Sequence, residues 1–452
     1  MGFWRLTEEK LDTMKWVLSR PIRPGERTFS SLDSFMIWFA TGVIITAPAA
    51  GGLAIGAPVL WVTIPLMTIV AAVAFVPHYF SGKITQKYGL TNFIASRRAF
   101  GILGTNFGGI YNMLQCLGYL AVQTVMAGMT AVLVFENFGF SIPFWIIIAI
   151  MFIATILFVI FGPLGLKWAQ TIGSIALMIF GVTITIVLFT GGFDWNAILF
   201  TPNPNPTSTY PMVLELFVAY NLTWLPLIGD YSRYAKTPRA GAWMPIIGLC
   251  AAQFWFYVLG ALSMGVLGTW DPSGFVATYG LGQGMASMLF MVIGCITTNA
   301  VLLYSAITSL LPIYPKKLEL GLSRWIILGV FVAVTFGLCF TSILDLFGAM
   351  LVALSGVTIS SFFGISVADW LYHKFTLNVE ELYNLKGLYK YIGGFNLRAI
   401  IPMALSIVVQ EYIYFYHYEW CTWVGIVLPG MVLSGLLYIV LTLVFPPNYM
   451  KK

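Results

Sequence analysis

The chain has 452 residues, of which 59% are hydrophobic and only 9% are charged, and its formal net charge is +6. Apolar runs of about 18 to 28 residues follow one another along the sequence, and runs of this length cross a bilayer as helices. The composition therefore excludes a soluble globular protein and predicts an all-α polytopic membrane protein. The basic excess is ordinary for loops beside anionic headgroups, so no nucleic-acid partner is expected.

Twelve spans are predicted, between an N-terminal arm (1–30) and a C-terminal tail (446–452). In chain order the spans cover residues 31–57, 59–80, 104–133, 142–163, 165–192, 211–229, 242–267, 283–312, 324–342, 346–372, 396–415 and 419–445.

Charged residues alternate between the predicted loops. Lys and Arg lie in the arm, in the tail, at Lys167 and in loops 83–98, 233–239, 316–324 and 374–398. The intervening loops hold only acidic residues, namely Glu136, Asp194, Asp271, Asp345 and Glu419. Because basic loops stay on the cytoplasmic side, both termini are predicted to be cytoplasmic, in a plasma or inner membrane.

The first and sixth spans are interrupted. The first contains Gly42, Pro48 and two further glycines, and the sixth is polar at its middle and contains Pro226. Helices that break at membrane depth line cavities or bind ions, although Gly and Pro are also common in uninterrupted membrane helices. The two spans lie five apart, which predicts an inverted repeat of five helices each (31–192 and 211–372) with helices 11 and 12 (396–445) appended.

Polar residues on the third and eighth spans predict ligands. Gly294, Thr297 and Thr298 lie on the eighth span, and two adjacent hydroxyls are neutral oxygen ligands that suit an alkali cation. Alternatively, these hydroxyls bond to their own helix or join neighbouring helices. On the third span, Tyr119 and Gln123 share a face, and an aromatic plane beside an amide suits a flat heterocycle; helix packing is the alternative.

Three ionisable residues lie within or near spans. Glu215, early in the sixth span, is either a proton-coupling or substrate-pairing carboxylate, or an outer-end residue that reaches water. Asp230 and Asp369 end spans on the predicted cytoplasmic side, where Arg233 is the expected partner of Asp230. Cysteines and histidines do not cluster, so the sequence predicts no enzyme, resident metal or cofactor.

Several motifs carry a family resemblance. These are Gly82 to Ile84, Tyr88 to Leu90 and Ser96 to Gly101, then Asp230 to Lys236, Thr297 to Asn299 with Tyr304 to Ala306, and Gly364 with Ala368 to Trp370. Together they resemble the nucleobase:cation symporter-1 family over roughly residues 30 to 372. The segment Thr223 to Leu227 looks most like the cytosine and hydroxymethylpyrimidine transporter branch of this family.

The resemblance implies a five-plus-five inverted-repeat transporter of the leucine-transporter type. It would import a purine, pyrimidine or related heterocycle by symport with Na⁺ or H⁺. The cation would bind at Gly42, Ile45, Gly294, Thr297 and Thr298. The substrate would bind among Tyr119, Gln123, Tyr220, Asn221, Thr223, Trp224 and Asn299.

This chain departs from the family at two positions. Tyr119 and Asn221 stand where other members have Trp, which alters two stacking partners and leaves the substrate's identity open.

Other functional classes fit less well. No span has the repeating polar face of a channel. An amino-acid:cation symporter on the same architecture is the main alternative, and it would bind a substrate carboxylate at the glycine-rich break of the first span.

Overall fold

The computed structural model describes residues 20–267, 282–314, 321–346, 352, 355–420 and 425–447. The regular elements within these ranges are helices, and two isolated bridges, Phe29 with Ala235 and Ile392 with Phe395, are the extended pairings recorded there. The α-helices are α2 (Ser31–Gly42), α3 (Thr46–Gly52), α4 (Leu60–Ala74), α5 (Val76–Tyr88), α6 (Asn92–Ala95), α7 (Arg97–Phe100), α8 (Thr105–Asn137), α9 (Phe144–Ile160), α10 (Gly162–Thr190), α11 (Trp195–Phe200), α12 (Tyr210–Leu222), α13 (Leu225–Ser232), α14 (Met244–Leu267), α16 (Gly282–Thr308), α18 (Gly321–Leu338), α20 (Val357–Tyr372), α21 (Val379–Tyr383), α22 (Leu397–Tyr416) and α24 (Val427–Val444).

The described helices agree with the predicted spans. Eight helical segments are long and apolar enough to cross a membrane, and two of these segments each join two α-helices, α4 with α5 and α12 with α13. The pair α2 and α3 forms one further, bent span, and α9, α18 and α20 are shorter apolar helices. The second span continues past its predicted end to Tyr88, because its polar last turns pack against the segment before α14, where Gly82 touches the backbone of Gly241. The last span begins only at Val427, because the aromatic stretch before it extends the apolar run without belonging to α24.

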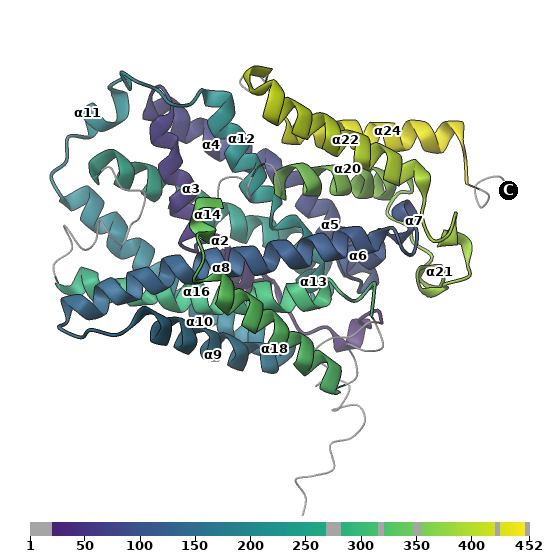
Figure 1. Cartoon of the computed structure of the whole chain (residues 1–452), viewed down its shortest axis with the longest axis horizontal. Coiled ribbons are helices and arrows are strands. Elements are labelled where there is room, and N and C mark those ends of the chain that lie inside the picture. Colours follow the sequence, from purple (N-terminus) through teal and green to yellow (C-terminus); the bar gives the residue numbers. More distant parts are fainter. Residues whose placement is uncertain are drawn as a thin grey trace, which may run out of the picture.

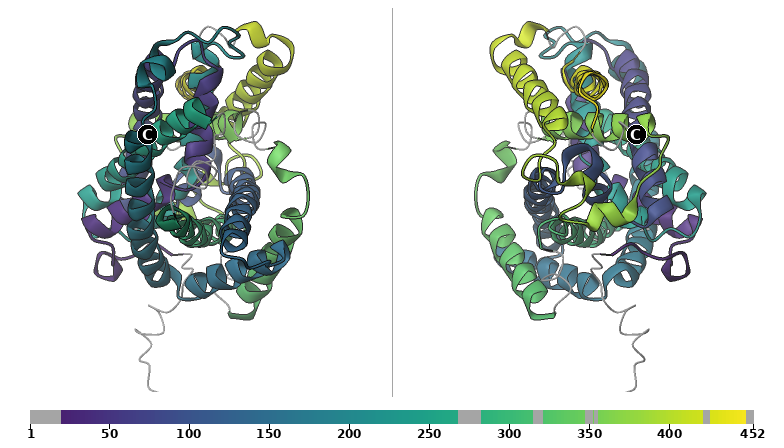
Figure 2. Two further views of the ribbon diagram at one scale, coloured as in Figure 1. Left: turned by 90° about the vertical axis from the view of Figure 1, so that its left-hand side faces the viewer. Right: turned by 90° about the vertical axis from the view of Figure 1, so that its right-hand side faces the viewer.

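The helices form an inner group and an outer group. The spans formed by α8, by α12 with α13, and by α16 are mostly buried in the protein, whereas fewer than half of the residues are buried in the most apolar stretch of α22, α24, α10 and the α4–α5 span. Figure 1 shows α8 running along the molecule, with α9 and α18 on one side of it and α22 and α24 on the other, and Figure 2 shows the same arrangement end-on. The inner group therefore holds the interrupted helices away from lipid.

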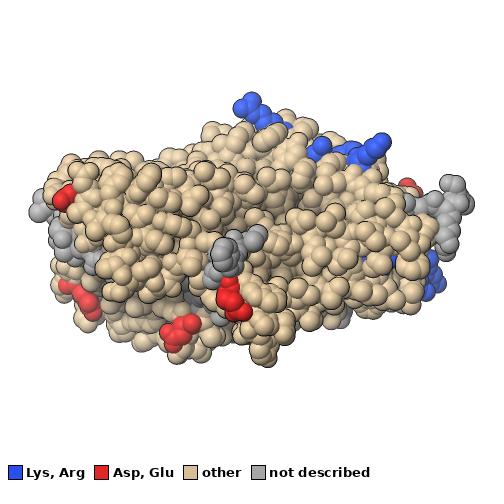
Figure 3. Space-filling view, turned by 90° about the horizontal axis from the view of Figure 1, so that it is seen from above, with Lys and Arg blue, Asp and Glu red and all other residues tan. Residues whose placement is uncertain are grey.

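Charge separates the two ends of the molecule. We call the end with α7 and α21, at the right of Figure 1, the basic end, and the end with α11 the acidic end. On the face drawn in Figure 3, acidic but no basic side chains are visible at the left-hand end, and Lys and Arg lie at the centre and the right. This asymmetry is the basis for predicting that the basic end is cytoplasmic.

The N-terminal arm docks onto the basic end. Thr28 and Phe29 donate backbone hydrogen bonds to the Tyr234 carbonyl, at 3.0 and 2.9 Å, and Lys236 donates back to Phe29 at 2.9 Å. Within the arm, the hydrogen bonds from Arg20 lower the pKa of Glu26 to about 2. The described part of the arm thus packs on the end of the sixth span.

Candidate substrate and cation site

The first span breaks at residues 43–45, where α2 and α3 meet at 52°. The N–H of Val43 still bonds to Phe39 and Ala40, and the chain resumes helical bonding only when Ala47 donates to the Ile44 carbonyl at 2.8 Å. Among the described residues, the backbone hydrogen bonds outside the helical ladders include none to the carbonyls of Thr41, Gly42 and Val43. These freed carbonyls are buried, so the break presents a group of unpaired oxygen acceptors inside the protein.

Helix α16 lies directly against this break. The Thr298 hydroxyl is 3.5 Å from the Ala40 carbonyl oxygen, and the thiol of Cys295 lies against the backbone of Ile45. Thr297 and Gly294 face α10 instead: Thr297 packs on Gly173 and donates to the Gly294 carbonyl at 2.9 Å. Of the predicted cation ligands, Thr298 meets the first span one turn before the break, Ile45 at the break lies against α16, and Gly42 packs on α14. Thr297 and Gly294 are turned toward α10.

The sixth span is interrupted at Thr223 and Trp224, between α12 and α13. Pro226 has no N–H, so it cannot donate to the carbonyl of Leu222. Side chains from elsewhere bond to the exposed backbone: Gln115 of α8 donates to the Thr223 carbonyl at 2.9 Å, and Asn92 donates to the Leu225 and Pro226 carbonyls at 3.0 Å each. The break is therefore held from outside the helix.

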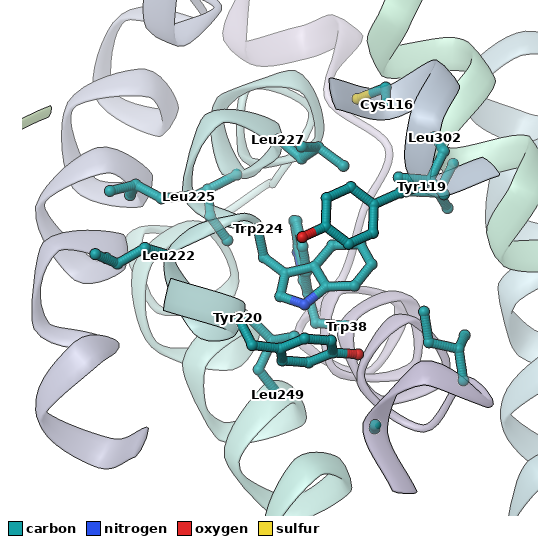
Figure 4. Packing of buried hydrophobic residues seen from close by; sticks show 14 of the residues in the cluster. Trp38, Cys116, Tyr119, Tyr220, Leu222, Trp224, Leu225, Leu227, Leu249 and Leu302 are labelled. Atoms are coloured by element: carbon teal, nitrogen blue, oxygen red, sulfur yellow. The ribbon is translucent and has the colours of Figure 1, made fainter. Parts of the chain in front are cut away.

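Aromatic rings gather beside the two breaks. The rings of Tyr220 and Trp224 lie 6.4 Å apart at 77°, and the Tyr220 hydroxyl is 2.8 Å from that of Thr46 at the start of α3. Figure 4 shows Tyr119 from α8 pointing into the space that Trp224 and Tyr220 occupy. The Tyr119 hydroxyl faces the side chain of Thr223. Residues from α3, α8, α12 and the α12–α13 break thus form one aromatic cluster.

Four predicted substrate residues carry a buried polar atom that has no hydrogen-bond partner among the described residues. They are Gln123 Oε1, Asn221 Nδ2, Trp224 Nε1 and Asn299 Oδ1. The other amide atom of each amide side chain is bonded: Gln123 donates to the Cys295 carbonyl at 2.8 Å, Asn221 accepts from Tyr257 at 2.9 Å, and Asn299 donates to Thr124 at 2.8 Å. The unpaired set is two acceptors and two donors, and leaving each one buried costs about 1 to 3 kcal/mol.

Comparison with known proteins identifies the family. Residues 21–438 match the family described as permease for cytosine/purines, uracil, thiamine, allantoin. The chain belongs to this permease family, the nucleobase:cation symporter-1 family that the motifs resemble.

Curated relatives and solved structures resemble the permease along nearly its whole length. It is 23% identical to a hydantoin permease of Microbacterium maritypicum, covering 86% of this chain and 83% of the relative. It is 24% identical to an allantoin permease of Bacillus subtilis, covering 94% and 93%. A nucleobase-cation-symport-1 family transporter, solved in a closed conformation with bromovinylhydantoin bound, superposes with a TM-score of 0.79 at 20% identity, covering 95% and 96%.

A more distant structure shares the fold. A Na⁺-coupled sialic acid symporter superposes with a TM-score of 0.62 at 15% identity, covering 94% of the permease and 92% of the symporter. These likenesses confirm the predicted fold class, a leucine-transporter-type inverted repeat with two C-terminal helices. The protein is a transporter and not an enzyme.

Sequence reasoning missed several site residues of the permease. Thr46, Gln115 and Tyr257 are hydrogen-bonded to predicted site residues, yet each is one polar residue in an apolar run and carries no motif. Gln253 of α14 is fully buried, packs against Gly42, and has neither amide atom bonded among the described residues. The rarity of an amide in the seventh span was the only available signal.

The structure gives each of the three ionisable residues of the spans a buried polar environment. The Glu215 carboxylate is buried and accepts hydrogen bonds from the N–H groups of Ile426 and Val427, at 3.0 and 2.7 Å, so it caps α24. This capping contact is an interaction that the sequence did not predict, in addition to the two roles that the sequence left open. Asp230 accepts from Ser305 at 2.9 Å, while Arg233 donates to the Tyr304 hydroxyl at 3.1 Å.

Asp369 has the basic partner that was expected near it. It forms a buried ion pair with Arg98 at 2.9 Å and accepts from the Tyr438 hydroxyl at 2.8 Å. The pair joins α7 to α20 at the basic end. Arg97 beside it donates to the carbonyls of Leu382 and Pro312, at 2.7 and 2.9 Å. These contacts join α7 to α20 and α21 at the basic end.

Proposed function

We propose that this permease imports a flat nitrogen heterocycle, of the cytosine, purine or hydroxymethylpyrimidine kind, together with a cation through alternating access. The observation that carries the proposal is the set of unpaired buried atoms on Gln123, Asn221, Trp224 and Asn299. Figure 4 shows one of these residues, Trp224, beside the rings of Tyr119 and Tyr220. Nucleobases and the hydantoin and allantoin named for the relatives all have ring or ureide edges of alternating N–H and C=O groups. Such an edge would pair two acceptors and two donors at once.

The aromatic cluster supports a planar substrate. Tyr119, Tyr220 and Trp224 are each at most 3% exposed. Stacking on such rings stabilises a flat ring, whereas a flexible aliphatic substrate would gain less from them. The hydrogen bond from Tyr257 fixes the amide of Asn221, so that its Nδ2 remains as the donor available to a ligand.

The coupling ion that we favour is Na⁺. The freed carbonyls of Thr41, Gly42 and Val43 and the hydroxyl of Thr298 are neutral oxygens, which suit an alkali cation and not a proton. Gln253, packed on Gly42, adds a carbonyl oxygen at the same place. Thr297 and Gly294, which were also predicted as ligands, would act by setting the position of α16 against α10.

The two breaks give a physical route for coupling. A cation that bridges α2 and α16 would fix the first span, and Thr46 in that span bonds to Tyr220 of the substrate cluster. Cation binding would therefore order the substrate site, and substrate binding would strengthen cation binding by the same factor. Rocking of one helix bundle would then expose the loaded site to the basic end.

The amino-acid alternative has weaker support. A substrate carboxylate would need open space along the glycine-rich segment of the first span, but a Cβ on Gly51, near the end of α3, would overlap the backbone of Tyr257. The glycine thus serves close packing of α3 on α14.

Uptake into proteoliposomes tests the proposal. Radiolabelled cytosine should accumulate under an inward Na⁺ gradient at constant pH, and unlabelled purines or hydroxymethylpyrimidine should compete according to their affinity, whereas amino acids should not. Protection by amino acids alone, with no uptake competed by any heterocycle, would refute the substrate class.

A further inference from the structure

A cavity of about 790 Å³ opens at the basic end, away from the transport site. Its walls are the α21–α22 connection, the first turns of α22 and the last turn of α24. In Figure 1 these segments lie together at the right-hand end of the molecule. The transport mechanism proposed above uses none of these residues.

The polar side of the cavity is cationic. Lys386, Lys390 and Arg398 line it, and no Asp or Glu is among its lining residues. Arg398 is held in place, because its Nε donates to Asn396 at 3.0 Å and its Nη1 donates to the Phe445 carbonyl at 2.7 Å. The carboxylate of Glu381, in α21, accepts from the backbone N–H of Leu388. The described residues provide no ion pair for either lysine.

The other side of the cavity is apolar and continues onto the lipid-facing surface. Ile401 of α22 and Leu441 of α24 line it together with Phe445. Ile401 and Phe445 are exposed, and so are Ile392 and Phe395 of the connection, Ile392 by 70%. Exposed apolar side chains beside lysines, at the ends of two spans, are the pattern of a segment that lies in the membrane interface.

We propose that this cavity binds an anionic phospholipid of the leaflet at the basic end. The phosphate would lie against Lys386, Lys390 and Arg398, and the acyl chains would follow Ile401 and Leu441 into the bilayer. Basic pockets at the ends of spans recognise anionic headgroups in this way. A free phosphate has the same charged group but no acyl chains to cover the apolar side of the cavity. Because the cavity has both a cationic and an apolar side, a phospholipid fits it better.

Thermal unfolding of the purified full-length permease in detergent tests this site. Phosphatidylglycerol should raise Tm in a saturable way, whereas phosphatidylcholine with the same chains and glycerol 3-phosphate without chains should not. The double variant Lys386→Gln with Lys390→Gln should need about thirtyfold more phosphatidylglycerol for half the effect, because each lysine near a headgroup contributes about 1 kcal/mol.

A matched control removes two charges elsewhere on the same end. Lys236→Gln with Arg239→Gln alters two exposed cations outside the cavity and should respond like the unaltered protein. The proposal is overturned if phosphatidylcholine raises Tm equally, or if the Lys386 and Lys390 variant keeps the full response. An equal rise with glycerol 3-phosphate would assign the cavity to a soluble phosphate instead.

Discussion

Thr297 and Thr298 are neighbours in sequence but meet different helices. Thr297 faces Gly173 of α10, and Thr298 reaches the Ala40 carbonyl at the first break. We predict that Thr298→Ala raises the Na⁺ concentration for half-maximal uptake about tenfold, because one cation ligand worth about 1 kcal/mol or more is lost. Thr183→Ala is the control, since its hydroxyl bonds only to its own helix on the exposed face of α10. Unchanged Na⁺ dependence in Thr298→Ala would remove this residue from the site.

Two measurements on a Gln253 variant, its Tm and its Na⁺ dependence of uptake, distinguish a functional role of this residue from a purely structural one. If its amide were only a buried polar group, Gln253→Leu would be stabilising, because an unpaired donor and acceptor disappear. We predict that this variant raises Tm without Na⁺ and at the same time weakens the Na⁺ dependence of uptake. A raised Tm with unaltered Na⁺ dependence would show that Gln253 takes no part in coupling.

At the scale of elements, α3 depends on glycine to approach α14. A Cβ on Gly51 would overlap the Tyr257 backbone, and a Cβ on Gly260 would overlap Pro48. We predict that Gly51→Ala lowers Tm by several degrees, since a separation of these helices also disturbs Tyr257 and Asn221. Gly337→Ala in α18, where no atom lies near the added Cβ, should leave Tm unchanged or slightly raised. Equal effects of the two changes would contradict this packing.

Glu215 joins two elements that are far apart in sequence, α12 and α24. Replacing it with Ala removes two hydrogen bonds to a charged acceptor, each worth about 1.5 to 3 kcal/mol, and uncaps α24. We predict a lowered Tm for Glu215→Ala, with the dependence of uptake on Na⁺ and pH retained in the protein that remains folded. A normal Tm with lost pH dependence would restore the proton-coupling interpretation.

Sequence patterns were sufficient to predict the membrane spans, but they predicted only some of the contacts between the spans. Length and hydropathy located the helices, and the glycine and proline pattern predicted an interruption within residues 40–52, because these properties are local. The partners of Glu215 and Gln253 lie on helices distant in sequence, so no local pattern reveals them. The start of α24 was misjudged for the same reason: its cap comes from α12, whereas the aromatic stretch before it reads as a continuous apolar run.

At the scale of the whole molecule, the paired breaks connect the cation and substrate sites. Thr298 touches the chain just before the first break, Thr46 after that break bonds to Tyr220, and Gln115 holds the second break. Thr46, Tyr220 and Thr298 are fully buried, and the ion pair of Arg98 with Asp369 ties α7 to α20 at the basic end. Joint binding of cation and heterocycle at the breaks is therefore the central claim.

Calorimetric titration of the purified protein with the best heterocycle from the uptake competition, at constant pH with and without Na⁺, tests this claim most directly. The account predicts that Na⁺ tightens heterocycle binding at least about fivefold, and that the heterocycle tightens Na⁺ binding by the same factor. Equal heterocycle affinity with and without Na⁺ would contradict the account.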